Sequence, residues 1–437
     1  MEPFNYETEG FKKSDDKDSP LKVCCINQEN ENKMNINYNN NNNNLNKTYL
    51  MKWVIVINLL SPFTIFYLYL LYFDSINSEA VESEDEFNLI IYIYRSMWSL
   101  VLLFFLSSLN FYIWDKFNIE YISIFKFKDY FKNPTTTNSI DEEPIIFNIL
   151  FKKSMVLLSI LCISLFVSIF HQSYDKIFSI FIWTCFFISL FYNKFIRSII
   201  IENMVLILKA PFKSITFLSF WIADQITSLS IFLKDFNMSS CFLITFFNVE
   251  YCSRQLGWLS IILSILPFLF RINQCLRVFY DNRENKSQLF NALKYFMGLI
   301  VLFFSNLYHN KDNEVYKVYW VSFAIVGTIF STYWDVVKDW GLFSKNSKNY
   351  LLRDQLLFSY KPFYYYSIVS NIIMRFTWVI LINPSYFGFK STNEVLIGIF
   401  LISIDIVRRC QWNFIRLEFE VIQLGFKNLK QINIVQI

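Results

Sequence analysis

The segment VLIGIFLISIDIVRRCQWNFIRL, residues 395–417, decides the fold class of this chain. It is long enough to cross the ~30 Å hydrocarbon core of a bilayer as one α-helix, yet ionisable side chains stand in its interior. Asp405 precedes Arg408 and Arg409 by three and four residues, so the three side chains share one face of a helix. A charge at the bilayer centre costs about 2.5–3.5 kcal/mol, so this face must point into a bundle. The segment therefore predicts a membrane protein whose helices enclose polar groups.

Apolar runs of similar length recur along the 437 residues, and they predict an all-α, polytopic transmembrane helical bundle of about ten spans. The composition agrees, because 54% of the residues are hydrophobic and only 17% are charged, which excludes a soluble enzyme. The net charge of +4 is too small to indicate nucleic-acid binding. The predicted spans are residues 53–73, 89–114, 154–170, 177–192, 215–248, 255–270, 291–308, 318–337, 363–383 and 395–417.

The fifth apolar run, residues 215–248, is longer than one upright span requires. It predicts either one tilted helix or a broken helix whose second half is residues 241–249. Cys241 and Cys252 flank the predicted outer end between the fifth and sixth spans. In a lumenal or extracellular setting they could form a disulfide, and a pair of free thiols is the alternative.

The loops between the runs differ in charge, and the difference predicts the topology. Loop 74–88 has four glutamates and no Lys or Arg, whereas basic residues gather in loops 115–153, 193–214, 271–290 and 338–362. Because basic loops stay in the cytoplasm, this alternation predicts that both termini are cytoplasmic.

Four regions follow from these patterns. Residues 1–50 are polar and Asn-rich, which predicts a disordered cytoplasmic tail. Residues 51–210 are a membrane region of four predicted spans with almost no charge inside them. Residues 211–425 contain the charged spans, and residues 426–437 form a cytoplasmic C-terminal tail.

Ionisable residues inside the later spans are the candidates for function. They are Asp224, Lys294, Asp335, Asp339, Arg375, Asp405, Arg408 and Arg409. Exposed to lipid, they would cost well over ~10 kcal/mol, so they must line a polar cavity or pair with one another. Arginine offers a planar fork of donors that matches tetrahedral oxyanions, and the carboxylates can hold the arginines when no anion is bound. The residues thus predict a cation-lined pathway for an anion.

A structural reading of some of these charges stays open. Arg416 lies near a span end and could extend to the headgroups, and Asp335 and Asp339 could be interfacial caps. Arg375 has apolar sequence on both sides and cannot reach water easily.

No cofactor or metal is expected. The chain has two histidines and no CxxC pair, which leaves too few ligands for a common zinc site. A phosphate-binding loop of the G-x-x-x-x-G-K-[ST] kind is also missing from the sequence, so nothing indicates ATP-driven pumping or an enzyme.

From about residue 212 to 425 the chain resembles the EXS-domain family, which includes eukaryotic phosphate exporters of the xenotropic and polytropic retrovirus receptor type. The matching motifs are WIADQ at 221–225, RINQCLR at 271–277, NALKY at 291–295, WDVVKDWGLF at 334–343, LRD at 352–354, YYY at 364–366, RFTW at 375–378, RR at 408–409 and WNFIRLE at 412–418.

The resemblance implies a phosphate pathway in this half of the chain. Its lining would be Asp224, Lys294, Tyr295, Asp335, Asp339, Arg375, Trp378, Arg408 and Arg409. The four basic residues would contact phosphate, while Asp335 and Asp339 would position them or help to gate. Trp378, one turn after Arg375, would be a gate or a packing residue.

The expected partners are inorganic phosphate and membrane lipids, with a homodimer as one arrangement and no nucleic acid. Many family members begin with an SPX domain that senses inositol pyrophosphates, and here only a 50-residue tail precedes the first predicted span. The short form resembles Golgi members of the family, so we expect the Golgi or the plasma membrane. The alternative function is recycling of lumenal phosphate in the Golgi, or a scaffold that retains Golgi enzymes.

Overall fold

A computed structural model describes residues 84–130, 145–170, 176–245, 248–344, 347–387 and 394–435. Within these ranges the ordered elements are all helical. The predicted tail, residues 1–50, and the predicted first span, residues 53–73, lie outside the described residues.

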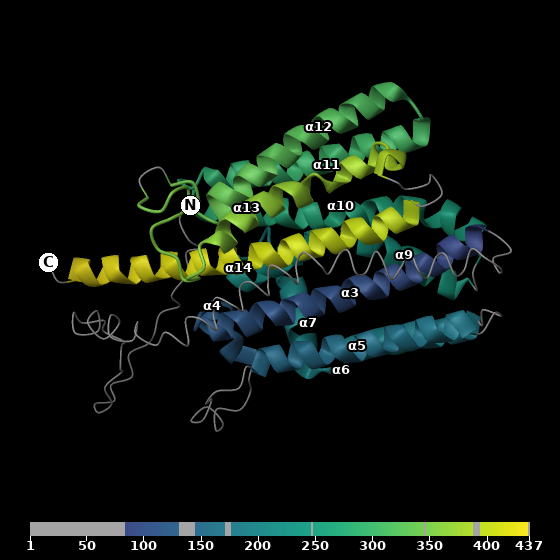
Figure 1. The fold of residues 1–437 in the computed structure, drawn as a ribbon, viewed down its shortest axis with the longest axis horizontal. Helices are drawn as coiled ribbons and strands as arrows, with labels where there is room; N and C mark the ends of the chain where they lie inside the picture. Colours follow the sequence, from purple (N-terminus) through teal and green to yellow (C-terminus); the bar gives the residue numbers. More distant parts are fainter. Residues whose placement is uncertain are drawn as a thin grey trace.

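Most of the helices lie roughly along one direction and form a bundle (Figure 1). The longer ones are α3 (Glu84–Lys116), α5 (Ile145–Phe170), α6 (Lys176–Tyr192), α7 (Lys194–Leu208), α8 (Phe217–Thr227), α9 (Ser230–Ile244), α10 (Val249–Asp281), α11 (Ser287–Lys311), α12 (Glu314–Tyr333), α13 (Pro362–Arg375) and α14 (Glu394–Val435). The short ones are α4 (Tyr121–Ile124), η2 (Phe127–Tyr130), η4 (Trp334–Asp339), η5 (Thr377–Leu381) and η6 (Pro384–Phe387).

Five helical segments in the described ranges are long and apolar enough to cross a membrane, and α6 with α7 makes a sixth if this bent pair is one span. The five are Tyr92–Lys116, Ile145–Ser164, Gly257–Asp281, Ser287–Lys311 and Glu314–Asp339. The chain is therefore a multi-pass helical membrane protein, and the number of about ten spans stays a prediction.

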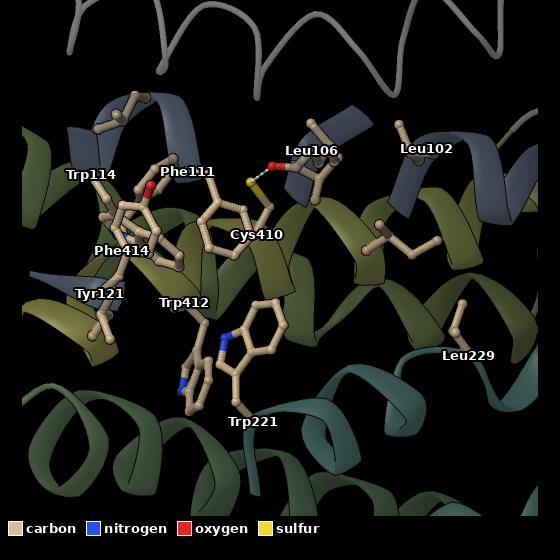
Figure 2. Packing of buried hydrophobic residues seen from close by; sticks show 14 of the residues in the cluster. Leu102, Leu106, Phe111, Trp114, Tyr121, Trp221, Leu229, Cys410, Trp412 and Phe414 are labelled. Atoms are coloured by element: carbon tan, nitrogen blue, oxygen red, sulfur yellow. Dashed lines mark hydrogen bonds between the residues drawn. The ribbon is translucent and has the colours of Figure 1, made fainter. Parts of the chain in front are cut away.

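Helix α14 lies near the centre of the bundle, between α3 on one side and α13 on the other (Figure 1). Every side chain from Ile406 to Glu418 is buried, including all its charged ones. In Figure 2, Cys410 and Phe414 of α14 lie against Leu106 and Trp114 of α3. The Cys410 thiol donates to the Leu106 carbonyl at 3.5 Å. Such a helix can present polar groups only to other helices, as its sequence predicted.

Side-chain caps fix the starts of several helices. The Thr216 hydroxyl accepts the Ser219 amide at 3.2 Å before α8, and the Asn313 side chain accepts the Val315 amide at 2.9 Å before α12. These oxygens satisfy amides that have no partner within the helix. Pro362 opens α13, where its missing N–H costs nothing.

The fifth apolar run is broken, but not where the sequence suggested. Helix α8 ends at Thr227 and α9 begins at Ser230, so the second half does not begin at residue 241. The Thr227 hydroxyl donates to the Asp224 carbonyl at 2.7 Å, and the Ser228 amide donates to the Gln225 carbonyl at 3.1 Å. Hydroxyl side chains compete with the helical backbone in this way, which favours a helix end at this pair.

Several predicted loops also contain helix, and two of them bear on the sites described below. Helix α7 occupies most of loop 193–214, at 87° to α6. Helix α10 continues to Asp281, so Arg271 is inside a helix instead of in loop 271–290. The apolar run stops at this arginine, but the helix does not, because the side chain finds partners in the bundle.

Candidate functional site

Asp224 lies in the last turn of α8, just before the break. Its carboxylate is fully buried and meets the guanidinium of Arg271 from α10, with 2.9 Å between Nε and Oδ1. The Tyr295 hydroxyl of α11 donates to the same oxygen at 2.7 Å. The guanidinium also lies over the Phe220 ring, 4.2 Å from its centroid. Three helices thus fix the Asp224 side chain.

Arg409 of α14 reaches the break from the other side. Its Nη2 donates to the Thr227 hydroxyl at 3.0 Å and its Nε to the Ser228 hydroxyl at 3.3 Å. A third guanidinium nitrogen lies 4.0 Å from Asp224. The Trp412 ring, 5.0 Å away, covers one side of the guanidinium. The interrupted helix therefore supplies hydroxyl acceptors to an arginine within the bundle.

The turn after α12 is a π-helix, η4, which carries two buried carboxylates. Asp335 and Asp339 stand at its two ends, and the Trp340 amide closes the wide turn by donating to the Asp335 carbonyl at 2.9 Å. π-turns occur often at functional sites. Here the wide turn presents both carboxylates to the bundle interior, so they are not caps exposed at an interface.

Asp335 receives arginines from two helices. Arg375 of α13 donates to its Oδ2 through Nε at 2.8 Å and through Nη2 at 2.5 Å. Arg408 of α14 lies 3.7 Å from the same oxygen and donates to Asp405 at 2.7 Å. The Arg408 Nη1 has no hydrogen-bond acceptor among the described residues. One carboxylate oxygen is thus shared between two guanidinium groups.

Lys294 of α11 is the least tightly held cation. Its Nζ lies 3.9 Å from Asp339 Oδ2, beyond hydrogen-bond distance, and 4.6 Å from the centre of the Tyr295 ring. Asp339 in turn accepts the Trp412 indole N–H at 3.3 Å. The lysine is buried, so its charge interacts more strongly with the neighbouring groups than it would in water.

Apart from Trp378, the predicted pathway residues from Asp224 to Arg409 lie in one group of neighbouring charges, which we call the ion cluster. Its ion pairs form three sets, around Asp224, around Asp335 and between Lys294 and Asp339, and electrostatic interactions of Lys294 with Asp224 and with Asp335 join them. Its cations are Arg271, Lys294, Arg375, Arg408 and Arg409, and its carboxylates are Asp224, Asp335, Asp339 and Asp405. Five cations against four carboxylates leave a formal excess of one positive charge. Most of the cluster is buried, whereas the Asp405 side chain is 39% exposed.

Trp378 lies outside the ion cluster, on the 3₁₀-helix η5 that follows α13. Its indole N–H donates to the Thr328 hydroxyl of α12 at 3.0 Å, and its ring meets that of Trp320 at a centroid distance of 6.4 Å. It therefore joins α12 to the segment that carries Arg375, a place that suits a gate and a packing residue equally.

Sequence reasoning missed the role of Arg271, although it belongs to one of the quoted motifs. It also missed a second buried pair, in which Arg95 of α3 donates to both oxygens of Asp235 of α9 at 2.5 Å. Both residues lie inside predicted spans, and that position was the available signal. A third buried pair joins Arg353 to Glu418 at 2.5 Å, and the Tyr364 hydroxyl donates to Glu418 at 2.5 Å.

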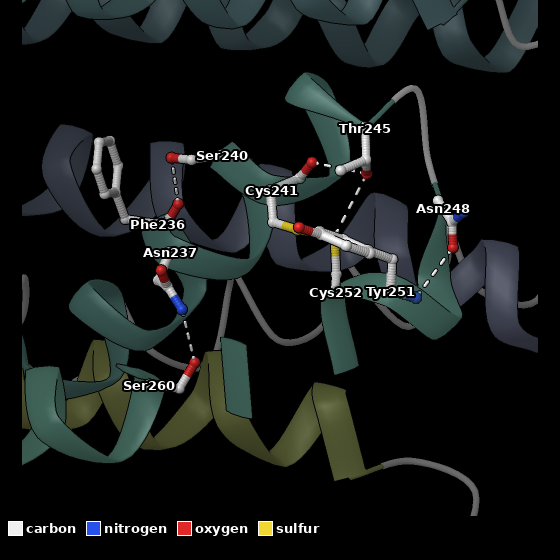
Figure 3. The surroundings of a disulfide bond; sticks show 9 residues. All are labelled: Phe236, Asn237, Ser240, Cys241, Thr245, Asn248, Tyr251, Cys252 and Ser260. Carbon is white, nitrogen blue, oxygen red and sulfur yellow. Dashed lines mark hydrogen bonds between the residues drawn. A yellow bond between two sulfur atoms is a disulfide. The ribbon is translucent and has the colours of Figure 1, made fainter. Parts of the chain in front are cut away.

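Cys241 and Cys252 are joined by a disulfide, the first of the two alternatives (Figure 3). Their Cα atoms are 5.9 Å apart, and the bond links the end of α9 to the start of α10. The Asn248 side chain caps α10 by accepting the Tyr251 amide at 3.0 Å. Elsewhere in the described ranges, no group of three His, Cys, Asp or Glu side chains is placed to hold a metal ion.

Comparison with known proteins shows which family this chain resembles. The EXS family model matches residues 90–422. Solute carrier family 53 member 1 of Mus pahari is 30% identical over 363 residues, which cover 76% of this chain and 50% of that protein. The xenotropic and polytropic retrovirus receptor 1 homolog of Xenopus laevis is 28% identical over 355 residues, 75% of this chain and 49% of that protein.

A plant relative is similar over a shorter stretch. Phosphate transporter PHO1 homolog 1 of Arabidopsis thaliana is 34% identical over 227 residues, which cover 51% of this chain and 28% of that protein. These names are those of transporters and a receptor, not of enzymes. The chain spans about half the length of the first relatives. The family match takes in α3 and α5 as well as the later helices, and by this match the chain belongs to the EXS family.

Proposed function

We propose that this chain transports inorganic phosphate across a membrane through the ion cluster. The observation that carries the proposal is the convergence of five cations from α10, α11, α13 and α14 on four carboxylates inside the bundle. The excess positive charge favours an anion, and four of the five cations are arginines, whose planar forks match phosphate oxygens. Similarity to proteins named as phosphate transporters supports this substrate.

When no anion is bound, the carboxylates would pair with the cations that an anion would otherwise contact. Asp335 holds Arg375 and Arg408, and Asp405 holds Arg408. A phosphate that enters would take over these guanidinium donors, and Asp335 and Asp405 would be released from them. Because the positive groups are already fixed by the bundle, the anion replaces its hydration shell with preorganised donors.

Asp335, Asp339 and Trp378 would control passage. The two carboxylates occupy the donors between transport events, and Trp378 ties η5 to α12 through Thr328. Movement of η5 would shift Arg375, which ends the preceding helix. Lys294, Arg408 and Arg409 would contact the anion along the way, with Asp224 and Tyr295 supporting them.

The topology is part of the proposal. About ten spans, with both termini in the cytoplasm, would arrange residues 51–210 as an N-terminal membrane region and 211–425 as the transport domain. Residues 1–50 and 426–437 would be cytoplasmic tails. Phosphate would then leave the cytosol at the plasma membrane, or leave the lumen of the Golgi.

A second candidate function is a membrane scaffold for other Golgi proteins, with the charges as structural pairs. The observation that favours it is that each carboxylate of the ion cluster already has a cationic partner.

Labelled phosphate efflux from proteoliposomes separates the two functions. A transporter releases the label faster than protein-free liposomes do, and Arg277→Ala, which breaks an exposed pair outside the cluster, leaves the rate unchanged. Efflux equal to that of protein-free liposomes, from protein that elutes as a folded species, would favour the scaffold.

A further inference from the structure

Helices α6 and α7 form an elbow that the proposed transport does not use. Only Asn193 separates them, and its side chain accepts the Ile196 amide at 3.1 Å, which starts α7 in a new direction. The angle between the two helices is 87°, and in Figure 1 α7 runs across the direction of α5 and α6. Since α6 matches a predicted span, α7 would lie along the membrane surface.

A groove of about 520 Å³ follows the elbow. Its wall is one face of α6, where Trp183, Phe187 and Phe191 repeat at four-residue spacing beside Ile188. The Trp183 and Phe187 rings are 4.4 Å apart between centroids, so the wall is continuous. An apolar wall of this kind fits an acyl chain and does not fit a hydrated anion.

The mouth of the groove is cationic. Arg197 of α7 lines it, and its side chain is exposed, with one long 3.4 Å hydrogen bond from Nη1 to the Phe191 carbonyl. Lys194, also exposed, precedes it by three residues on the same side of α7. The nearest acid along α7, Glu202, accepts the Ser198 hydroxyl at 2.6 Å. Two cations of α7 therefore stand beside an apolar groove, and along the described α7 the first carboxylate after them is that of Glu202.

Residues at both ends of α7 are typical of a membrane surface. Tyr192 is 83% exposed before it, and Phe212 is 86% exposed after it. Exposed Lys209 and Lys213 accompany Phe212. Amphipathic aromatic rings and basic side chains gather where hydrocarbon meets headgroups. This places the mouth of the groove at headgroup depth and its wall at acyl-chain depth.

We propose that the elbow of α6 and α7 binds one anionic phospholipid, with an acyl chain along the α6 groove and the headgroup phosphate at Arg197 and Lys194. Apolar wall and cationic mouth together match this ligand. A free phosphate would make no favourable contact with the apolar wall. A second copy of the chain would not require the two neighbouring cations.

Helix α7, which carries the proposed headgroup site near its start, packs close to the ion cluster near its other end. Ile207 of α7 packs with Ala223 of α8 and Phe270 of α10 in a buried group. These two residues directly precede Asp224 and Arg271 in the sequence. The proposed lipid therefore steadies the helices that hold one end of the cluster, although its binding does not depend on what the cluster transports.

Native mass spectrometry of the purified full chain tests the site. Delipidated protein is incubated with phosphatidylserine or with phosphatidylcholine of the same acyl chains, and the retained lipid is counted. Wild type should retain one phosphatidylserine in preference to phosphatidylcholine. Arg197→Gln should lower this retention about fivefold, since a basic side chain near anionic lipid contributes about 1 kcal/mol. Ile188→Trp, which fills the groove from an exposed position, should lower retention of both lipids.

Lys209→Gln is the matched control. Lys209 is exposed and directly follows α7, but it lies outside the groove. Unchanged retention in this variant supports the proposal, and a loss equal to that of Arg197→Gln overturns it as general surface attraction. Equal retention of both lipids by wild type, no effect of Arg197→Gln, or displacement of the lipid by inorganic phosphate would each overturn it. So would a change of oligomeric state in Ile188→Trp with lipid retention unchanged.

Discussion

The protein buries two kinds of ionic site, and they differ in charge balance. Arg95 and Asp235 form a buried pair, in which Arg95 donates two hydrogen bonds of 2.5 Å to the carboxylate. The ion cluster has one cation more than it has carboxylates, and the Arg408 Nη1 and the Arg271 Nη2 lack acceptors among the described residues. This balanced pair joins α3 to α9, whereas the excess positive charge of the ion cluster is the basis of the anion pathway proposed above. The charge balance, and not burial, is therefore the feature that separates the two sites.

The largest expected effect is the loss of phosphate flux on removal of cluster arginines. Arg375→Ala and Arg408→Ala should each abolish efflux from proteoliposomes while the protein still inserts, because each removes donors that phosphate would use. Insertion is checked by the elution profile of the detergent-solubilised protein. Flux that is unchanged in both variants would remove these residues from the pathway and leave the cluster as a second structural site.

The balanced pair should respond in stability and not in flux. Arg95→Met leaves the Asp235 charge buried without its partner, which costs about 3–5 kcal/mol and should lower the Tm sharply. Arg95→Met combined with Asp235→Leu should recover most of that loss, because apolar residues replace both charges. Thermal unfolding in detergent measures both. Should the double variant be stable but lack flux, the pair would belong to the pathway.

The Gly398 position sharpens the same point. A Cβ at Gly398 of α14 would collide with the Arg95 guanidinium. Gly398→Ala should therefore destabilise the protein by about 1–3 kcal/mol, the usual cost of overpacking. This loss is smaller than the one expected for Arg95→Met. The control is Gly257→Ala, where a Cβ meets no atom within 4 Å. Equal Tm values for the two alanine variants would contradict the packing of α14 against Arg95.

Trp378 should give a smaller change. Trp378→Ala removes the tie to Thr328 and the contact with Trp320, so leak current through single channels should rise. Trp378→Phe keeps a ring without the N–H donor and should leak less. An open probability that is the same in all three proteins would make Trp378 a packing residue.

The smallest expected effect concerns the solvent-exposed carboxylate of Asp354. Asp354, in the loop before α13, accepts the Lys348 amide at 2.7 Å and the Ser347 hydroxyl at 2.9 Å. The Lys348 amide, followed by the hydroxyl, lowers the pKa of Asp354 below its ordinary 3.8. A lowered pKa gives stability that is present above the ordinary value and is lost as the pH falls through the lowered one. Amide exchange in residues 347–354 should therefore accelerate only in strong acid, and Asp354→Asn should remove this dependence.

The sequence predicted most members of the ion cluster, because charged side chains inside apolar spans must face the interior of the bundle instead of lipid. Helical spacing placed Asp405 with Arg408, and the structure has that pair. What spacing cannot give is the partner on another helix. The pairing of Arg271 with Asp224 was missed because the apolar run stops at Arg271, so the arginine was assigned to a loop.

Breaks in helical regularity were also beyond the sequence. The π-turn at 334–339 inserts extra width into a helix, and a 3.6-residue pattern contains no mark of it. The break after Thr227 depends on hydroxyl groups that also serve Arg409, a contact between residues more than 180 positions apart. The 87° bend between α6 and α7 occurs at Asn193, whose side chain caps α7. Asn is common in loops, so this residue alone does not indicate a bend between two helices.

Helix α14 is a single rod of 42 residues, which at ~1.5 Å per residue is about twice as long as the hydrocarbon core is thick. The same rod carries Arg408 and Arg409 at one level and Glu418, tied to Arg353 and Tyr364, at another. Rotation of this rod about its axis cannot reorient the arginines without pulling on the Glu418 tether. Torque applied to the loop that bears Arg353 would in this way be felt at the centre of the bundle.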